Sequence, residues 1–349
     1  MKSLHLIICI LAILINTNVQ SLAGTDATRL FIIKANNDYF KRSKHPSSDK
    51  RYTHGSHIGF IRNGTFSFLS NTGKRLQNAL DCDELYTSTI LMQDIYTSDN
   101  IDDEIPPADE HPFSGELNFV LGLHFRKQDP MFWQFDQQTL FSLEVSLGAT
   151  GKYSFAENAQ KEIHRLTGDT IPQGWDHQLA SHFSGRVSAC VKKRFRYIIH
   201  QDWGLSLQKT IHLSGDIGNT LVQCAYGGEL RIGIHVPDDF GIYAQGPGNI
   251  GSNVQGRNGV IRSDGDRFGL YLILMAEAKY VHYDYHIGEI VTPVRGIGDL
   301  GGGIGYAQSR IWKLPAFKIE LCYIRRTEEF KEQDGPHRFG TLSIVAPLN

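Results

Sequence analysis

Alternation of apolar and polar residues is the dominant pattern along the chain. In 141–149 the odd positions are apolar and the even positions are polar or glycine, and 205–213 repeats this arrangement. A period of two residues predicts β-strands with one apolar and one polar face. Segment 186–199 also has a basic face, formed by Arg186, Lys192, Arg194 and Arg196. Because a cation that faces lipid costs roughly 2–4 kcal/mol at the bilayer midplane, this face must look into a wet lumen or bulk water.

About twelve such runs follow one another, and an even number suits a closed antiparallel barrel. They lie near 28–38, 53–62, 85–95, 116–126, 137–150, 182–199, 205–213, 219–234, 268–280, 301–312, 316–325 and 338–347. The tenth run has an alternative position at 281–300. The pattern predicts an all-β fold, a transmembrane up-and-down antiparallel β-barrel. A soluble β-sandwich has the same alternation and stays open as an alternative.

One polar segment interrupts the strand pattern. Residues 159–166 contain no Gly or Pro and can form two helical turns, which Gly168 ends. Gln160 and His164 lie four positions apart and therefore share a face of this helix. A short helix in a long loop of a β protein is typical of a functional segment. A histidine that only caps or packs the loop helix is the competing structural interpretation.

Up-and-down topology brings distant residues together. It places the loops after the first, third and fifth strands on one rim, namely 39–52, 96–115 and 151–181. Asn37 and Asp38 end the first strand, Thr53 opens the second, and His164 lies in the third loop. We therefore expect these side chains to converge at one rim. The loops 63–84 and 235–267 on the opposite rim are longer than the short turns typical of such barrels.

The beginning of the chain has the features of a secretory signal peptide. Lys2 is followed by an apolar core and by the small-residue cleavage site Ser21-Leu22-Ala23. We expect residues 1–23 to be removed and 24–349 to form a single barrel domain. Of the four cysteines that remain, Cys190 falls on the polar face of its run and Cys224 on the apolar face of another, so these two are not expected to pair.

Charge and motif content exclude several classes of function. A net charge of -2 argues against nucleic acid as a partner. The chain contains neither a G-x-S-x-G elbow nor an HExxH zinc motif. We interpret His54/His57 and His282/His286 as structural or surface pairs, and the glycine-rich run 295–303 as a turn or a set of close strand approaches.

Amide and carboxylate oxygens gather where the first strand ends. Asn36, Asn37 and Asp38 offer ligands of the kind that a hard cation such as Ca²⁺ prefers. The structural interpretation is that Asn and Asp simply end the strand and begin a turn.

Several blocks resemble, in order, a known family. NNDYF (36–40) with DKRYTHG (49–55) resembles the (E)NDxF…TDRYYTNG pattern of the lipid A 3-O-deacylases of Gram-negative outer membranes. The segment QKEIHRLTGDTIPQGWDHQL is similar to that family's QxxxH…G…P-x-GW-x-x-QL block. Three further blocks match, namely QDIYTSDNIDDEIPPADEHPFSG, RIGIHVPDDFG and RRTEEFKEQDGPHRFGTLSI.

The resemblance implies a twelve-stranded outer-membrane barrel with a Ca²⁺-dependent esterase site at its outer rim. Its substrate would be the 3-O-linked acyl chain of lipid A, and we expect a monomer in the outer membrane. By position, His164 matches the general base, Asn37 and Asp38 the site dipeptide and metal ligands, Thr53 the site hydroxyl, and Gln160 the site glutamine. The family's acidic residue after the histidine falls near Asp169 or Thr170.

The chain departs from the family pattern at named positions. Asn36 replaces Glu, His54 replaces Asn, and Glu110-His111 replaces Asp-Arg. The chain ends in Ala-Pro-Leu-Asn, without a terminal aromatic residue. A non-catalytic barrel, either a pore, a receptor or an inactive relative, therefore stays open as an alternative, as does a soluble periplasmic hydrolase or binding protein.

Overall fold

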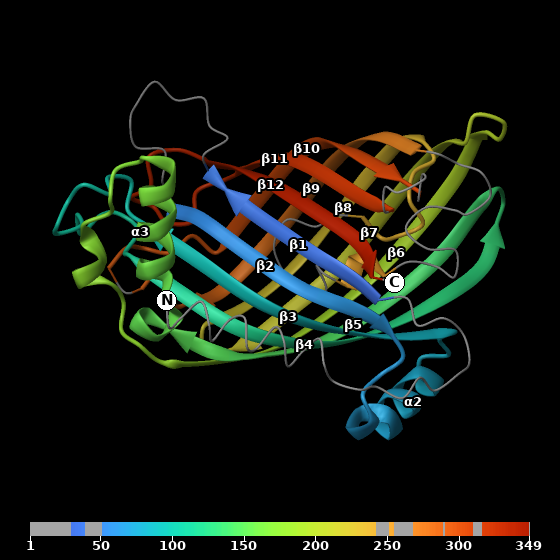
Figure 1. Ribbon diagram of the computed structural model, residues 1–349, viewed down its shortest axis with the longest axis horizontal. Coiled ribbons are helices and arrows are strands. Elements are labelled where there is room, and N and C mark those ends of the chain that lie inside the picture. The colour runs from blue at the N-terminus through green and yellow to red at the C-terminus, as the bar shows by residue number, and fades with distance from the viewer. Residues whose placement is uncertain are drawn as a thin grey trace.

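A closed antiparallel barrel accounts for all the strands in the described part of the chain (Figure 1). The computed structural model describes residues 29–38, 51–241, 251–254, 268–288, 290–309 and 316–348. The strands are β1 (Arg29–Asn37), β2 (Arg51–Asn63), β3 (Glu84–Thr97), β4 (Ser114–Phe132), β5 (Phe135–Thr150), β6 (Phe183–His200), β7 (Leu205–Gly218), β8 (Leu221–Ile234), β9 (Phe268–Asp284), β10 (Gly296–Gln308), β11 (Phe317–Arg326) and β12 (His337–Leu348). Each pairs with its sequence neighbours, and β1 pairs with β12. The predicted signal peptide lies outside the described residues.

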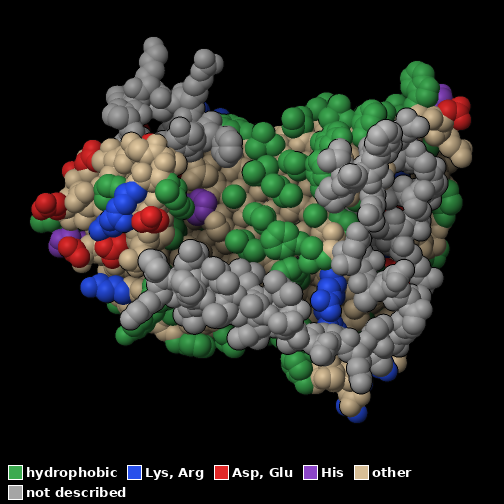
Figure 2. Space-filling view, viewed as in Figure 1, with side chains coloured by type: hydrophobic (Ala, Val, Ile, Leu, Met, Phe, Trp, Pro, Cys, Tyr) green, Lys and Arg blue, Asp and Glu red, His purple; other side chains and the backbone are tan. Residues whose placement is uncertain are grey.

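The alternating faces separate the outside of the barrel from its interior. On β5 the apolar residues Leu143, Val145 and Leu147 are exposed, while Glu144 between them is buried. Figure 2 shows hydrophobic side chains spread over the outer wall. On the basic face of β6, Lys192 and Arg194 are buried inside the barrel and Arg186 and Arg196 are half-buried. The prediction that this face looks into the lumen is confirmed, and the soluble sandwich is not the observed fold.

The tenth strand begins earlier than the range 301–312 that alternation favours. It runs over Gly296–Gln308 and includes most of the glycine-rich run, which is therefore strand rather than turn. Glycines have no side chain with which to show alternation, so the pattern underestimates this strand. They permit close contact: a Cβ at Gly305 would lie 2.1 Å from the ring of Tyr271.

Two helices lie outside the wall. Helix α3 (Ala156–Thr167) confirms the predicted helix and extends it by about one turn. Helix α2 (Ser70–Ala79), after the 3₁₀ turn η2 (Ser67–Leu69), was not predicted. Leu76 of this helix and Leu80, which follows it, pack against Leu85 and Leu123 of the outer wall. Among the described residues, no helix is long and apolar enough to cross a membrane.

A segment after β8 folds back into the barrel and meets charges from several strands. Asp238 pairs with Arg194 of β6 at 2.5 Å and with Arg126 of β4 at 3.1 Å. Asp239 pairs with Arg231 of β8 and Lys318 of β11, each at 2.7 Å. The segment therefore ties opposite parts of the wall together from within.

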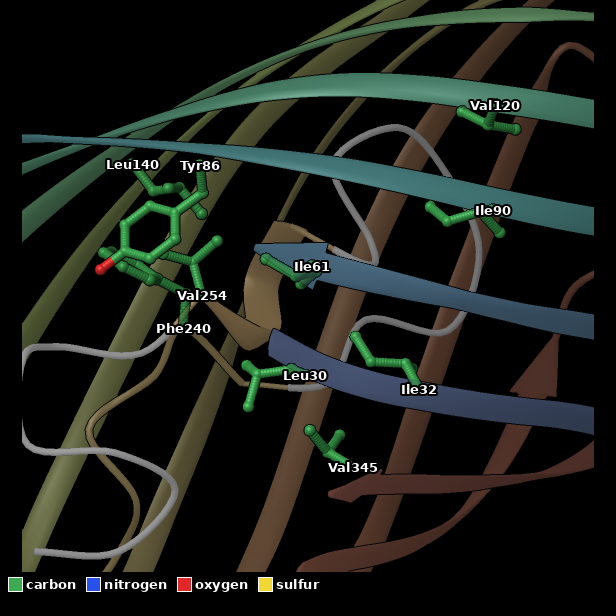
Figure 3. Packing of buried hydrophobic residues seen from close by; sticks show 10 residues of the cluster. All are labelled: Leu30, Ile32, Ile61, Tyr86, Ile90, Val120, Leu140, Phe240, Val254 and Val345. Carbon is green, nitrogen blue, oxygen red and sulfur yellow. The ribbon is translucent and has the colours of Figure 1, made fainter. Parts of the chain in front are cut away.

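Apolar residues after β8 also contact the inner wall of the barrel. Phe240 and Val254 join a buried cluster that includes Tyr86 and Leu140 on the inner wall (Figure 3). The segment therefore occupies the interior with both charged and apolar side chains.

Removing one buried charge of this network should destabilise the barrel. Asp239→Asn removes the fully buried carboxylate that lies nearest to Arg231 and Lys318 and leaves Glu320 as their shared partner. Breaking a buried ion pair costs about 3–5 kcal/mol. We expect a lower urea midpoint, measured by tryptophan fluorescence in detergent micelles. The control is Asp81→Asn, which removes the exposed partner of Lys127 and should leave the midpoint almost unchanged. Equal midpoints for the two variants would contradict this account.

Candidate functional site at the barrel rim

The predicted Asn–Asp pair lies where β1 meets the rim. Asn37, the last residue of β1, pairs with His54 on β2 and with Gly340 on β12. Its amide Nδ2 lies 3.4 Å from His54 Nδ1. Asp38 follows with a fully buried side chain, whereas Asn37 is half-buried. A buried carboxylate thus stands at a strand end, next to an amide.

A chain of hydrogen bonds holds this corner from the inside. Asn36 Nδ2 donates to Tyr52 Oη at 2.9 Å, and Tyr52 Oη donates to Asp94 at 2.9 Å. On the other side, Thr341 Oγ1 donates to Asn36 Oδ1 at 2.8 Å. An amide can donate and accept in this way at once, which a carboxylate cannot. Asn36 therefore joins β12, β1, β2 and β3 at the rim.

Thr53 occupies an irregular position at the start of β2. The pairing of β2 with β3 shifts between Tyr52 and His54, so that Thr53 forms a β-bulge. Its buried hydroxyl lies 2.7 Å from that of Thr97. Bulges re-aim side chains and are frequent next to active sites.

The residue that opens β2 is strained. Arg51 has a φ of 60°, a left-handed conformation that is uncommon for a residue other than glycine. Its buried guanidinium lies 3.4 Å from Asp99 and 3.9 Å from Glu110. The ion pairs hold the strained residue in place, and strain of this kind often accompanies functional sites. Glu110 is one of the departures from the family pattern and here serves as a partner of Arg51.

Helix α3 carries Gln160 and His164 on its buried face, together with Ala156. The helix follows Phe155, whose φ is 56°, and ends at Gly168, whose φ is 78°. It contacts β3 and β4. A Cβ on Gly115 would lie 2.2 Å from that of Ala156, so the glycine lets the helix approach the wall.

Both polar side chains on this face have partners that fix their orientation. His164 Nδ1 lies 2.5 Å from the backbone oxygen of Thr170. Because a carbonyl oxygen only accepts, Nδ1 carries the proton, and in the neutral ring Nε2 is the basic nitrogen. Gln160 Oε1 accepts a hydrogen bond from Trp175 Nε1 at 2.9 Å.

Of the two positions near which the family's acidic residue was expected, Asp169 and Thr170, it is Thr170 that contacts His164, through its backbone oxygen. Thr170 lies six residues after His164 and supplies its oxygen. The carboxylate of the neighbouring Asp169 accepts a hydrogen bond from Thr167.

The structure places the five predicted residues in two groups on one rim. Asn37, Asp38 and Thr53 form the corner between β1 and β2, and Gln160 and His164 lie on α3. Figure 1 shows α3 at the end of the barrel where β1 ends. A row of paired residues links the groups, running from Asn37 through His54 and Ile95 to Gly115, which adjoins Ala156 of the helix.

A third group at the same rim was not singled out from the sequence as functional. His286 Nε2 lies 3.2 Å from Glu116, and its Nδ1 lies 2.7 Å from Ser114 Oγ. The ring of Tyr96 stacks on His286 with centroids 4.6 Å apart and on His111 with centroids 5.2 Å apart. Tyr96, His111, Glu116 and His286 border an interior cavity of about 120 Å³. Only the fold shows that a loop after β9 reaches β3 and β4.

The contacts of this third group suggest a serine–histidine–carboxylate triad, but its chemistry does not fit one. Burial lowers the pKa of His286, yet the hydrogen bond and negative charge of Glu116 outweigh this and hold the pKa above its usual value. A raised pKa favours the protonated ring, which cannot accept the proton of Ser114, and the side chain of Ser114 is also fully buried. Burial lowers the pKa of His111 to about 3, which keeps that ring neutral. We therefore interpret the group as structural.

The corner residues match Ca²⁺ in the kind of donor they offer. Asp38 supplies a buried carboxylate and Asn37 an amide oxygen, and Ca²⁺ is bound by oxygen ligands. The described ranges contain no group of three or more His, Cys, Asp or Glu residues that could hold a metal ion. Since Ca²⁺ takes about six to eight ligands, backbone, water or substrate oxygens would have to complete such a site.

The fold agrees with one class of known structure. The closed barrel, its apolar outer wall and its charged interior define a β-barrel of the bacterial outer membrane. LpxR from Salmonella typhimurium has the same fold with a TM-score of 0.65 and 16% identity, over 91% of this chain and 99% of that chain. The transport unit of the autotransporter AIDA-I from Escherichia coli aligns over 97% of this chain and 96% of that chain, but its TM-score of 0.38 and 8% identity carry no argument.

The sequence itself places the chain in a family. The model of the outer membrane protein LpxR matches residues 6–347, so the chain belongs to the LpxR family. This confirms the resemblance to the lipid A 3-O-deacylases and the location in the outer membrane of a Gram-negative bacterium. No curated protein matches the chain.

The ion pair of His286 should make the rim sensitive to pH. The pKa of His286 is higher in the folded protein than in the unfolded chain, where it is about 6.5. The stabilisation from its ion pair is therefore fully present below about pH 6.5 and is lost as the pH rises through the folded pKa. We expect proteolytic cleavage in the loop after β9 to accelerate as the pH rises above the ordinary histidine value of about 6.5. His286→Gln should be cleaved quickly throughout, and His282→Gln, at an exposed neighbour, should behave as the wild type. If the wild type were cleaved as quickly as His286→Gln at every pH, the ion pair between His286 and Glu116 would not stabilise this loop.

Proposed function

We propose that this protein hydrolyses the ester that joins the 3-O-linked acyl chain to lipid A. The observation that carries the proposal is the orientation of His164. His164 lies on the buried face of the rim helix α3, and its Nδ1 donates a hydrogen bond to the backbone oxygen of Thr170. With the proton on Nδ1, Nε2 is the nitrogen that acts as the base. Membership of the LpxR family supports the substrate class.

His164 acts as the general base in the proposed reaction. Its Nε2 takes a proton from a water molecule, and the water oxygen attacks the carbonyl carbon of the ester. The bond between that carbon and the sugar oxygen then breaks, and the imidazolium returns its proton to the departing oxygen. A general base of this kind contributes about 10²–10⁴-fold.

The other rim residues hold and orient the reactants. Gln160, one helical turn before His164, directs the ester carbonyl or the water. Thr53 keeps the corner in place through its hydrogen bond to Thr97. Asp38 and Asn37 would hold Ca²⁺, which when bound polarises the ester carbonyl and stabilises negative charge on its oxygen.

The position of the site at the rim suits a lipid substrate. The filled interior does not suit the alternative function, an open pore. The apolar outer wall continues up to the rim, where the ester of a membrane lipid lies between headgroup and acyl chains. The interior, by contrast, is occupied by Asp238, Asp239 and Phe240, with their partners on the wall. This filling disfavours an open pore.

Substitution of the base or of the buried carboxylate should remove the activity. We expect His164→Ala to lower the rate by about 10²–10⁴-fold, and Asp38→Ala to abolish release of the acyl chain. Both variants should keep the heat-modifiable migration of a folded barrel. The measurement is mass spectrometry of lipid A from a host that lacks this activity.

The matched control is His177→Ala, which removes an exposed histidine from the same loop. This variant should retain wild-type activity. Unchanged lipid A in cells that contain folded wild-type barrel would rule out the proposed function and favour a receptor or an inactive relative.

Removal of divalent cations should act through the corner between β1 and β2. We expect EDTA to stop acyl release and added Ca²⁺ to restore it. Calorimetry of the purified barrel should show Ca²⁺ binding that Asp38→Asn weakens and His164→Ala leaves intact. Full activity in EDTA, or equal binding by Asp38→Asn, would show that this corner holds no functional Ca²⁺.

A further inference from the structure

Two arginines face each other on the outside of the barrel, at the rim opposite the candidate site. Arg29 is the first residue of β1, and its direct partner on β2 is Arg62. On both strands, buried residues that face the lumen alternate with half-buried residues that face outward, and both arginines belong to the outward set. Arg29 and Arg62 therefore form an arginine pair on the lipid-facing wall, and like charges directly opposite each other destabilise a sheet.

No carboxylate in the described part of the chain forms an ion pair with this arginine pair. Inside the barrel, by contrast, Arg194 and Arg231 each meet a carboxylate. Arg62 donates a hydrogen bond from Nη2 to the backbone oxygen of Thr65 at 2.6 Å, and its guanidinium lies 4.6 Å from the centroid of the Phe66 ring. A carbonyl and an aromatic ring hold the cation in place, but neither carries the negative charge that would neutralise it.

Helix α2 adds positive charge next to the arginine pair. Its Lys74 and Arg75 are exposed, and the helix contains no Asp or Glu. A Cβ at Gly73 of this helix would lie 3.4 Å from the side chain of Thr65, whose backbone oxygen accepts the hydrogen bond from Arg62. Figure 2 shows Lys and Arg side chains in the region that α2 occupies in Figure 1. The helix and the arginine pair thus form one basic surface at this rim.

Aromatic side chains border the arginine pair on the side toward the middle of the wall. Phe31 and Phe60, each two residues farther along its strand, are direct partners with ring centroids 5.3 Å apart. Phe68, just before α2, is 72% exposed. Aromatic residues of this kind line the two borders of the apolar band in outer-membrane barrels. The arginine pair therefore lies at the level of the lipid headgroups, where a cation costs far less than at the bilayer midplane.

We propose that the arginine pair, together with the basic residues of α2, binds the phosphate of an anionic glycerophospholipid in the leaflet opposite the candidate site. A guanidinium can offer two parallel N–H groups to phosphate oxygens, and the phosphate supplies the negative charge that the pair lacks. An acyl chain of the same lipid lies against Phe31 and Phe60. This inference goes beyond the proposed function and does not require that the barrel hydrolyses an ester.

A lipid matches this surface better than the other possible anions. Free phosphate would neutralise the arginines, but it would leave the neighbouring phenylalanine rings without a partner. An acidic protein would have to reach side chains that stand beside the lipid-facing rings of β1 and β2. A glycerophospholipid carries the phosphate and the apolar chains in the order in which the wall presents the arginines and the rings.

The experiment is native mass spectrometry of the purified barrel in detergent, titrated separately with phosphatidylglycerol, phosphatidylcholine and inorganic phosphate. We expect the wild type to bind phosphatidylglycerol at least about tenfold more tightly than phosphatidylcholine. Each basic residue near an anionic lipid surface contributes roughly a factor of five. Arg29→Gln/Arg62→Gln should therefore weaken binding of phosphatidylglycerol by about 10–30-fold and leave binding of phosphatidylcholine unchanged.

The matched control is Lys152→Gln/Lys331→Gln, which removes the same charge from exposed residues in the loops after β5 and β11. This control should bind phosphatidylglycerol as the wild type does. Both double variants should keep the heat-modifiable migration of a folded barrel. Arg29→Lys/Arg62→Lys keeps the charge but loses the paired N–H groups, so it should bind with intermediate affinity.

Each contrary result is distinct. Equal affinity of the wild type for the two lipids, or an equal loss in the control, would show that no specific headgroup site exists and would overturn the inference. Inorganic phosphate that binds as tightly as phosphatidylglycerol and depends equally on the arginine pair would assign the site to the free anion and also overturn it. Acyl release from lipid A should be the same in Arg29→Gln/Arg62→Gln and in the wild type. A wild type without acyl release contradicts only the proposed function.

Discussion

Pairing of buried charges inside the barrel is the constraint on which the rest of the structure depends. Taking an ion out of water costs several kcal/mol unless an opposite charge and further hydrogen bonds meet it. Asp239 meets this requirement by joining Arg231 and Lys318 from two strands. At the rim, Glu116 and His286 do the same between β4 and the loop after β9. The wall is thereby braced from within, which gives the rim side chains a rigid support.

The candidate site uses this support in two ways. The corner between β1 and β2 is held by the bonds of Asn36, by the bulge at Thr53 and by the ion pairs of the strained Arg51. The helix that carries His164 rests on the wall, and a backbone carbonyl orients its imidazole. A carbonyl can hold a ring and fix its tautomer, although it lacks the charge with which a carboxylate would stabilise the imidazolium.

Much of the architecture could be predicted from the sequence because the membrane and the polar lumen impose a period of two on each strand. The positions of β5 and β6, the short helix with Gln160 and His164, and the shared rim all follow from that pattern. The start of β10 was missed because glycine shows no alternation, and α2 because its apolar stripe is short. The contacts of His286 with Ser114 and of Trp175 with Gln160 depend on how loops fold over the rim, which no local pattern encodes. The sequence placed the family's acidic residue near Asp169 or Thr170, and only the fold shows that the backbone oxygen of Thr170 contacts His164.

The central claim is that one ester on the outer rim lies within reach of both the imidazole of His164 and the carboxylate of Asp38. A crystal structure of the protein with Ca²⁺ and a lipid A analogue that resists hydrolysis tests it most directly. The account predicts that the carbonyl carbon lies one water molecule away from Nε2 of His164, with Asp38 facing the carbonyl oxygen directly or through Ca²⁺. An analogue bound elsewhere, or one that contacts only one of the two groups, would contradict it.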